Sequence, residues 1–166
     1  MKIFHSFSSE ETKAFGAEIA KSLIAPPSSR LRRASDRSTS NTGALVIALR
    51  GDLGTGKTTF TQGFFRGLGM KRNPISPTFV IMRRYKVPSR KPKVRSCFTD
   101  IYHFDAYRLK KEEDVEVLEF GKIMSDPKNI VLVEWPEKIK GVLPRGTMRL
   151  DFIHGKKENE RTIKMA

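Results

Sequence analysis

The strongest constraint on the fold is the order of three neighbouring segments between residues 44 and 69. Residues 44–49 form an unbroken apolar run, which is typical of a strand buried on both faces of a parallel sheet. A glycine-rich stretch follows at once, and behind it Phe60, Phe64 and Leu68 recur at helical spacing up to Gly69. Strand, glycine loop and helix in this order form the context that a phosphate-binding loop requires.

The glycine-rich stretch satisfies the P-loop pattern in full, from Gly51 to Gly56-Lys57-Thr58. Glycines let successive backbone N–H groups turn toward an anion, and the start of the following helix adds its positive dipole. We expect Lys57 to reach the β- and γ-phosphates and the Thr58 hydroxyl to ligate Mg²⁺. The predicted ATP-binding residues are Gly51, Asp52, Leu53, Gly54, Thr55, Gly56, Lys57, Thr58 and Thr59.

Two carboxylates are candidates for the acid that holds Mg²⁺ or orients water beside such a loop. Glu134 directly follows the apolar run 130–133, and Asp105 ends an alternating stretch over 98–104. Both would emerge at the carboxyl edge of a sheet, where ligands bind in open α/β folds. A solvated Glu134, or an Asp105 paired with Arg108, is the structural alternative. The pattern does not decide which of the two acids ligates the metal.

The remaining segments indicate one α/β domain over residues 1–166, a P-loop NTPase fold with a mostly parallel central sheet flanked by helices. Ser8 and Glu11 form a capping box for a helix over about 9–24. Further elements are expected as an extended segment at 75–85, a helix at 111–124, and an antiparallel terminal strand pair at 148–152 and 162–165 around Gly155.

The net charge of +14 is concentrated in two stretches, which we expect to form loops at about 26–43 and 86–97. Residues 26–42 hold four arginines against one aspartate, and residues 83–95 hold seven basic residues and no acid. Both stretches fit solvated loops, and both fit a surface that docks tRNA phosphates. With one cysteine, no apolar run of membrane length and no secretory signal, we expect a cytoplasmic protein that makes no membrane contact.

Several further residues near these motifs carry weaker signals. Thr78, in Ser76-Pro77-Thr78, fits an ordinary turn and also a hydroxyl that senses the γ-phosphate. We interpret His103 as a packed strand residue, because no other histidine has metal-ligand spacing with it. Trp135 and Tyr107 fit aromatic residues of the core or of the site's rim.

Four motifs taken together carry a family resemblance. They are the P-loop 51–60, the segment Ser76-Pro77-Thr78-Phe79, the segment from Tyr102 to Leu109 and the segment from Val133 to Glu137. In this order they resemble the TsaE (YjeE) family, the bacterial ATPases of tRNA threonylcarbamoyladenosine (t6A) modification. The resemblance covers nearly the whole chain.

The resemblance implies Mg-ATP binding and an association with the TsaB–TsaD pair, which modifies adenosine 37 of tRNAs that read ANN codons. ATP hydrolysis, weak without partners, would reset that complex. By motif, Thr78 becomes the switch threonine, Asp105 and Thr58 lie at the metal, and Glu134 becomes the Mg²⁺-linked catalytic acid. Lys57 contacts phosphate and Trp135 lies beside the nucleotide. The two basic loops are longer than is usual in the family.

Three other functions remain open on the residues alone. A P-loop small-molecule kinase would need an arginine-bearing lid, for which Arg145 or the loop arginines could serve. A GTP switch protein would need an Asn/Thr-Lys-x-Asp segment, which the chain lacks. A basic RNA-binding module would use ATP only structurally.

Overall fold

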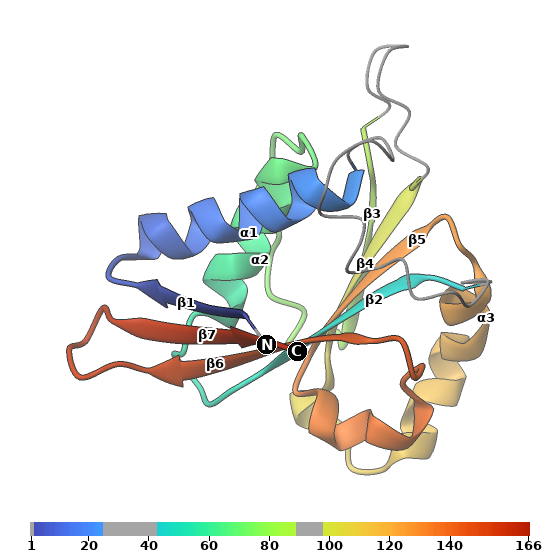
Figure 1. Ribbon diagram of the computed structural model, residues 1–166. Helices are drawn as coiled ribbons and strands as arrows, with labels where there is room; N and C mark the ends of the chain where they lie inside the picture. The colour runs from blue at the N-terminus through green and yellow to red at the C-terminus, as the bar shows by residue number, and fades with distance from the viewer. Residues whose placement is uncertain (1, 25–42, 89–97) are drawn as a thin grey trace.

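The computed structural model describes residues 2–24, 43–88 and 98–166, which form a mixed α/β architecture around one seven-stranded sheet (Figure 1). The strands are β1 (Lys2–Ser6), β2 (Leu45–Arg50), β3 (Met82–Lys86), β4 (Asp100–Asp105), β5 (Asn129–Glu134), β6 (Met148–His154) and β7 (Arg161–Met165). The α-helices are α1 (Ser9–Ile24), α2 (Lys57–Gly67) and α3 (Phe120–Ser125). Within these described ranges, 3₁₀ helices span Ala106–Arg108, Glu112–Leu118 and Pro136–Val142.

The sheet has a parallel centre and antiparallel flanks. Its strand order is β1-β7-β6-β2-β5-β4-β3, and β2 lies parallel to both β5 and β6 while β5 lies parallel to β4. The pairs β3–β4, β6–β7 and β1–β7 are antiparallel. Register places Leu49, Glu134 and Asp105 side by side on β2, β5 and β4. The carboxyl ends of three neighbouring strands therefore meet at one edge.

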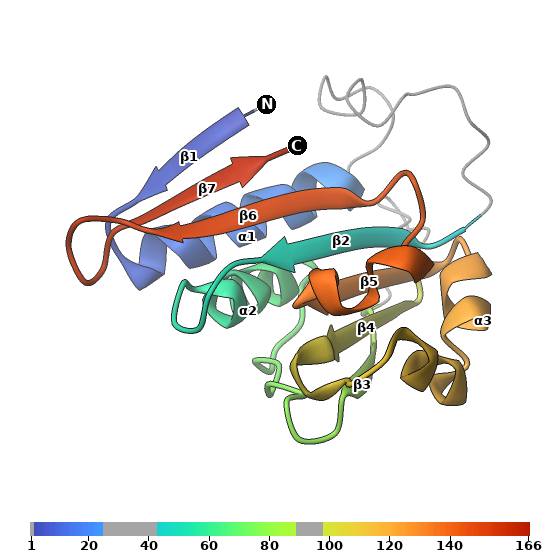
Figure 2. The ribbon, with the colours of Figure 1, turned by 90° about the horizontal axis from the view of Figure 1, so that it is seen from below.

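Helices cover both faces of the sheet, as the two views show (Figures 1 and 2). On one face α1 and α2 pack over a core that includes Phe15, Phe60 and Leu132. On the other face α3 and the 3₁₀ helices enclose a second cluster that includes Phe104, Val133 and Phe120. Alternate residues of the central strands point to opposite faces, which is why β4 and β5 contribute to both clusters.

The helices α1 and α2 approach each other closely because glycines lie at their contact. A Cβ atom added to Gly16 of α1 would lie 2.4 Å from the carbonyl oxygen of Phe60 in α2. A Cβ atom added to Gly63 of α2 would lie 2.0 Å from the carbonyl oxygen of Lys13 in α1. Side chains at these positions would force the helices apart. The contact fixes α2, and with it the residues at the start of α2.

Several predicted elements are confirmed. The helix at 9–24 is α1, and Ser8 Oγ accepts a hydrogen bond from the Glu11 N–H, 3.1 Å away. The Glu11 carboxylate accepts from the Phe7 N–H at 2.7 Å instead of from Ser8, so only half of the predicted capping box forms. The helix before Gly69 is α2, and Gly69 adopts a left-handed φ of 84° just beyond its end. The predicted terminal strand pair is β6 and β7.

Other predictions are wrong or incomplete. The predicted helix at 111–124 is two short helices, broken at Glu119, whose φ is 52°. The predicted extended segment 75–85 contains a turn at 78–80, and only 82–86 forms a strand. The strand β1 was not predicted, and neither was the antiparallel pairing of β3.

The two predicted basic loops lie largely outside the described residues, namely at 25–42 and 89–97. Cys97 lies outside them too, and the prediction of a single domain over 1–166 stays a prediction. Lys86, predicted to begin the second loop, belongs to β3. In the described part of the chain, no helix is long and apolar enough to cross a membrane.

Candidate functional site

The glycine loop, residues 51–58, connects the end of β2 to the first turn of α2. Gly51, Gly54 and Gly56 have φ angles of 146°, 76° and 96°, a region that residues with a Cβ atom rarely adopt. A Cβ atom at Gly51 would also lie 2.4 Å from the Phe152 carbonyl oxygen. The buried Thr55 hydroxyl closes the loop by donating to the Asp52 carbonyl at 2.7 Å. The predicted glycine positions are therefore those that the backbone requires.

Lys57, the first residue of α2, bends back into this loop and is only 5% exposed. Its Nζ donates to the Gly51 carbonyl at 2.6 Å and to the Asp52 carbonyl at 2.8 Å. It also lies 4.5 Å from the centre of the Trp135 ring. Burial lowers the pKa of Lys57, and attraction to Glu134 and Asp105 opposes that shift. Among the described residues, no carboxylate lies within ion-pair distance of this ammonium group.

The two predicted acids lie on adjacent strands at the same edge, because Asp105 of β4 is in register with Glu134 of β5. Both are 3% exposed. Glu134 Oε1 lies 3.4 Å from the Thr58 hydroxyl, which donates to it. The predicted alternative of a solvated Glu134 is thus wrong. Four sequence-predicted residues, Lys57, Thr58, Asp105 and Glu134, gather at the mouth of the glycine loop.

Asp105 also fixes the position of Thr78. The Thr78 hydroxyl donates to Asp105 Oδ2 at 2.5 Å, and the Tyr107 N–H donates to Oδ1 at 3.0 Å. The predicted alternative in which Asp105 pairs with Arg108 does not occur. Instead the Arg108 guanidinium stacks over the Phe79 ring, with 4.5 Å from Cζ to the ring centre. The turn that carries Thr78 is thereby attached to the acidic edge of the site.

The predicted aromatic residues form the rim of the site. Trp135 is half-buried with a left-handed φ of 57°, and its ring centre lies 5.1 Å from that of Tyr107. Leu53 is 80% exposed, and Asp52 is exposed as well. Thr59 is half-buried in the first turn of α2.

Sequence reasoning did not predict the polar role of His103. The ring is fully buried, as expected for a packed strand residue, but its Nε2 lies 2.8 Å from Glu134 Oε1. The usable signal was the two-residue spacing from Asp105, which places both side chains on the same face of β4.

A second contact to the glycine loop comes from the β6–β7 hairpin. The Arg161 guanidinium of β7 donates to the Gly54 carbonyl at 3.0 Å, and the His154 Nε2 of β6 lies 3.2 Å from the Leu53 carbonyl oxygen. Arg161 also donates to the carbonyls of Glu158 and Glu160. No sequence motif marked these residues. They contact the loop at the carbonyl groups of Leu53 and Gly54.

The basic residues of β3 have an acidic partner that the linear sequence concealed. Arg84 and Lys86 lie 2.7 Å and 3.0 Å from Asp100 of the neighbouring strand β4. The hydrogen bond from Arg84 holds the pKa of Asp100 at about 2. Two of the seven positive charges at 83–95 are therefore already paired.

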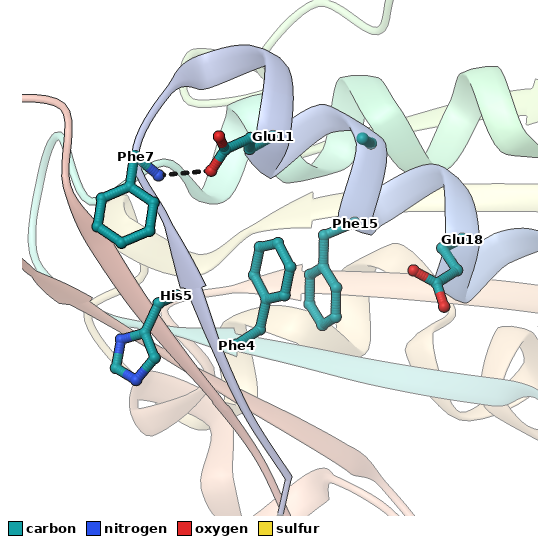
Figure 3. A pocket seen from close by; sticks show the side chains of 7 residues that line it. Phe4, His5, Phe7, Glu11, Phe15 and Glu18 are labelled. Atoms are coloured by element: carbon teal, nitrogen blue, oxygen red, sulfur yellow. Dashed lines mark hydrogen bonds between the residues drawn. The ribbon is translucent and has the colours of Figure 1, made fainter.

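A groove of about 360 Å³ lies elsewhere, between β1 and α1 (Figure 3). Phe4 and Phe15 stack there with ring centres 4.3 Å apart, and the Glu11 carboxylate accepts from the Phe7 N–H. None of its lining residues is a predicted site residue. The groove is open, and the convergent polar groups lie at the glycine loop instead, so we place the candidate site at the loop.

The oxygen ligands at the loop suit a hard cation whose remaining ligands are water and phosphate oxygens. Thr58, Glu134 and Asp105 supply a hydroxyl and two carboxylates, the oxygen ligands that Mg²⁺ prefers. Within the described ranges, no group of three or more His, Cys, Asp or Glu side chains could hold a metal ion. Magnesium at nucleotide sites is held through one or two carboxylates and the substrate phosphates, so these residues fit it.

Comparisons with known proteins agree with one another. The family model "Threonylcarbamoyl adenosine biosynthesis protein TsaE" matches residues 6–163. The tRNA threonylcarbamoyladenosine biosynthesis protein TsaE of Haemophilus influenzae is 38% identical over 109 residues, which is 66% of this chain and 63% of that protein. The protein of the same description from Bacillus subtilis is 37% identical over 119 residues, covering 71% of this chain and 66% of that protein. The matched parts thus span slightly less than two thirds of these relatives.

A solved structure is also similar over most of its length. The crystal structure of YdiB from Bacillus subtilis superposes with a TM-score of 0.67 at 27% identity. The match covers 99% of this chain and 83% of that chain. The shared mixed α/β architecture and the family match lead to the same assignment. The chain belongs to the TsaE family, whose relatives named above are described as tRNA threonylcarbamoyladenosine biosynthesis proteins.

Proposed function

We propose that this chain is a P-loop ATPase that binds Mg-ATP in its glycine loop and serves t6A modification of tRNA in the cytoplasm with the TsaB–TsaD pair. The observation that carries the proposal is the burial of Lys57 inside the loop. Among the described residues, the ammonium group donates to two neutral carbonyls and lies beside one aromatic ring, while Glu134 and Asp105 attract it from beyond ion-pair distance. A buried cation without a counter-charge is costly to the fold. An anionic ligand would supply the missing partner.

Each residue of the site has a separate task under this proposal. Lys57 binds the β- and γ-phosphates, and the backbone N–H groups of the glycine loop surround the phosphate oxygens. Thr58 and Glu134, already 3.4 Å apart, hold the cation. Magnesium, when bound, neutralises phosphate charge. The Glu134 carboxylate orients water for attack on the γ-phosphate.

Asp105 and Thr78 act together on the other side of the acidic edge. Because both Asp105 oxygens already accept hydrogen bonds, from Thr78 and from the Tyr107 N–H, we assign Asp105 the role of holding the switch threonine. Thr78 then responds to the γ-phosphate. This division makes Glu134 the catalytic acid and leaves Asp105 a secondary position near the metal.

The partner assignment follows from the family. The relatives are described as t6A biosynthesis proteins, which supports a partnership with the tRNA modification machinery, and we propose the TsaB–TsaD pair as that partner. Arg84 and Lys86 share the single carboxylate of Asp100, so this part of the basic stretch is partly compensated and is the weaker candidate for a tRNA contact. The Phe79, Tyr107 and Leu53 side chains, all more than half exposed beside the site, offer apolar surface for a protein partner.

The test measures phosphate release from ATP by this chain alone and with the TsaB–TsaD pair, with GTP as control. We expect slow release alone, a clear increase with the pair, and little release from GTP. Glu134→Ala should still bind ATP but lose turnover, and Lys57→Ala should lose tight binding. No response to the pair would remove the link to t6A modification. Transfer of phosphate to a small acceptor would identify a kinase instead.

A further inference from the structure

His103 lies in the interior of β4 and is fully buried, yet it points its polar edge at the site. In the register of β4 with β5, His103 faces Leu132, two residues before Glu134. The Glu134 side chain therefore reaches back along the sheet to place Oε1 2.8 Å from His103 Nε2. Both side chains are at least 95% buried, so this hydrogen bond is shielded from water.

The contacts of the ring determine where its proton lies. Among the described residues, Nδ1 is buried and has no hydrogen-bond partner. A proton on Nδ1 would leave a buried donor unsatisfied, and it would turn the Nε2 lone pair toward a carboxylate oxygen. A proton on Nε2 removes both penalties. We therefore assign the neutral ring with the proton on Nε2, donating to Glu134.

This hydrogen bond leaves the two oxygens of Glu134 in different situations. Oε1 is held by His103 and also accepts from the Thr58 hydroxyl at 3.4 Å. Within the described part of the chain, Oε2 has no hydrogen-bond partner. An anchored Oε1 fixes the plane of the carboxylate, and the other oxygen stays available to a ligand.

We propose that His103, two residues before the end of β4, is a positioning residue. It orients the Glu134 carboxylate toward Thr58 and the cation. The inference rests on the proposed function, because it concerns the acid of that site. A residue that only filled space here would need no polar edge. The Phe65 ring centre lies 6.5 Å from that of His103 at a tilted angle, so it offers the ring apolar packing and no hydrogen-bond acceptor.

The discriminating pair of variants is His103→Gln and His103→Asn. The glutamine amide places an N–H near the position of the histidine Nε2, whereas the asparagine amide ends near Nδ1 and does not reach Glu134. Both variants are polar and smaller than or similar to histidine. Ile101→Val, two residues back on the same face of β4, controls for a change in packing without a change at Glu134.

The first readout is magnesium binding, which is monitored through the fluorescence of Trp135. This residue is the only tryptophan of the sequence, and its ring centre lies 4.5 Å from Lys57 Nζ. With ADP present, MgCl₂ is titrated into each protein. His103→Asn should raise the half-saturating Mg²⁺ concentration about 10- to 100-fold, the range seen when partners of metal ligands are removed. His103→Gln and Ile101→Val should stay within about threefold of the parent.

The second readout is steady-state ATP hydrolysis. His103→Asn should lower kcat by about the same 10- to 100-fold while the KM for ATP changes little, because Lys57 and the glycine loop are untouched. His103→Gln should restore most of kcat. If His103→Asn, His103→Gln and Ile101→Val all lose kcat to a similar degree, and all melt at a lower temperature than the parent, His103 has a packing role and the proposal is overturned.

A third measurement needs no nucleotide and no variant. Nitrogen-15 NMR of the His103 ring in the parent protein should show a neutral ring protonated on Nε2, and protonation on Nδ1 would overturn the proposal. A parent that shows no Mg-ATP response at all would instead overturn the proposed function, and the role of His103 with it. A parent that responds and a His103→Asn variant that matches it would overturn the role of His103 alone.

Discussion

Lys57 is a buried cation whose hydrogen-bond acceptors, among the described residues, are two neutral carbonyl oxygens. Burial lowers the pKa of its ammonium group, so folding disfavours the charged form that the phosphates would need. Such residues are kept for a ligand at a cost to the stability of the free protein. We therefore expect a substitution of Lys57 to weaken ATP binding without lowering the stability of the free protein.

We expect Lys57→Met to melt at the same temperature as the parent or higher, and to lose tight ATP binding. The lowered pKa means that the burial penalty is fully present below the pKa of the folded state. It shrinks as the pH rises past that pKa and is gone only above the ordinary lysine value of 10.5, where the unfolded chain also loses the proton. The stability difference should therefore narrow at alkaline pH. Thermal unfolding by circular dichroism at neutral and alkaline pH measures it. A large drop in melting temperature would mean that Lys57 is a structural residue.

The polar residues of the site were predictable from the sequence only where strand ends determine their position. Glu134 and Asp105 each follow a strand, and parallel strands bring their ends to one edge. His103 and Arg161 bond to Glu134 and Gly54, which are 31 and 107 residues away in the chain. No local pattern encodes a contact over that separation. The sequence could show that His103 was buried but could not show what its ring touches.

At the scale of elements, the most reliable predictions rested on several agreeing signals. The helix at 9–24 had the Ser8 cap, apolar residues at helical spacing (Phe15, Ile19 and Leu23) and the stop signal Pro26-Pro27 in the sequence. The helix α1 begins and ends as these signals predict. The segment 111–124 had roughly helical apolar spacing and acidic residues at its start, and the left-handed Glu119 divides it into two short helices. The strand β1 is paired only by β7 from the other end of the chain, so nothing nearby in sequence indicated it.

The contact between α1 and α2 supports a second prediction. Gly63→Ala should lower the free energy of unfolding by about 3 kcal/mol, because its Cβ atom would meet the Lys13 carbonyl oxygen at 2.0 Å. Gly121→Ala in α3 is the matched control, since nothing lies within 4 Å of its added Cβ atom. That variant should be neutral or more stable by up to about 1 kcal/mol. Chemical denaturation of both variants measures the difference, and equal effects would refute the close packing.

Over the whole molecule, the sheet order explains how distant segments form one site. Placing β2 between β6 and β5 brings the glycine loop, Glu134 and the β6–β7 hairpin to a single edge. The packing of α1 on α2 holds the start of α2 against the same edge. The strand order of the sheet therefore brings four motifs that are separate in the sequence together in one site.

The central claim is that this constellation binds Mg-ATP, and isothermal titration calorimetry tests it most directly. ATP with MgCl₂ is titrated into the parent chain and into Lys57→Ala, with GTP as the competing nucleotide. We expect saturable one-site binding of ATP by the parent, weaker binding of GTP, and no measurable binding by Lys57→Ala. Equal ATP affinity for the parent and Lys57→Ala, or no binding by the parent, would contradict it.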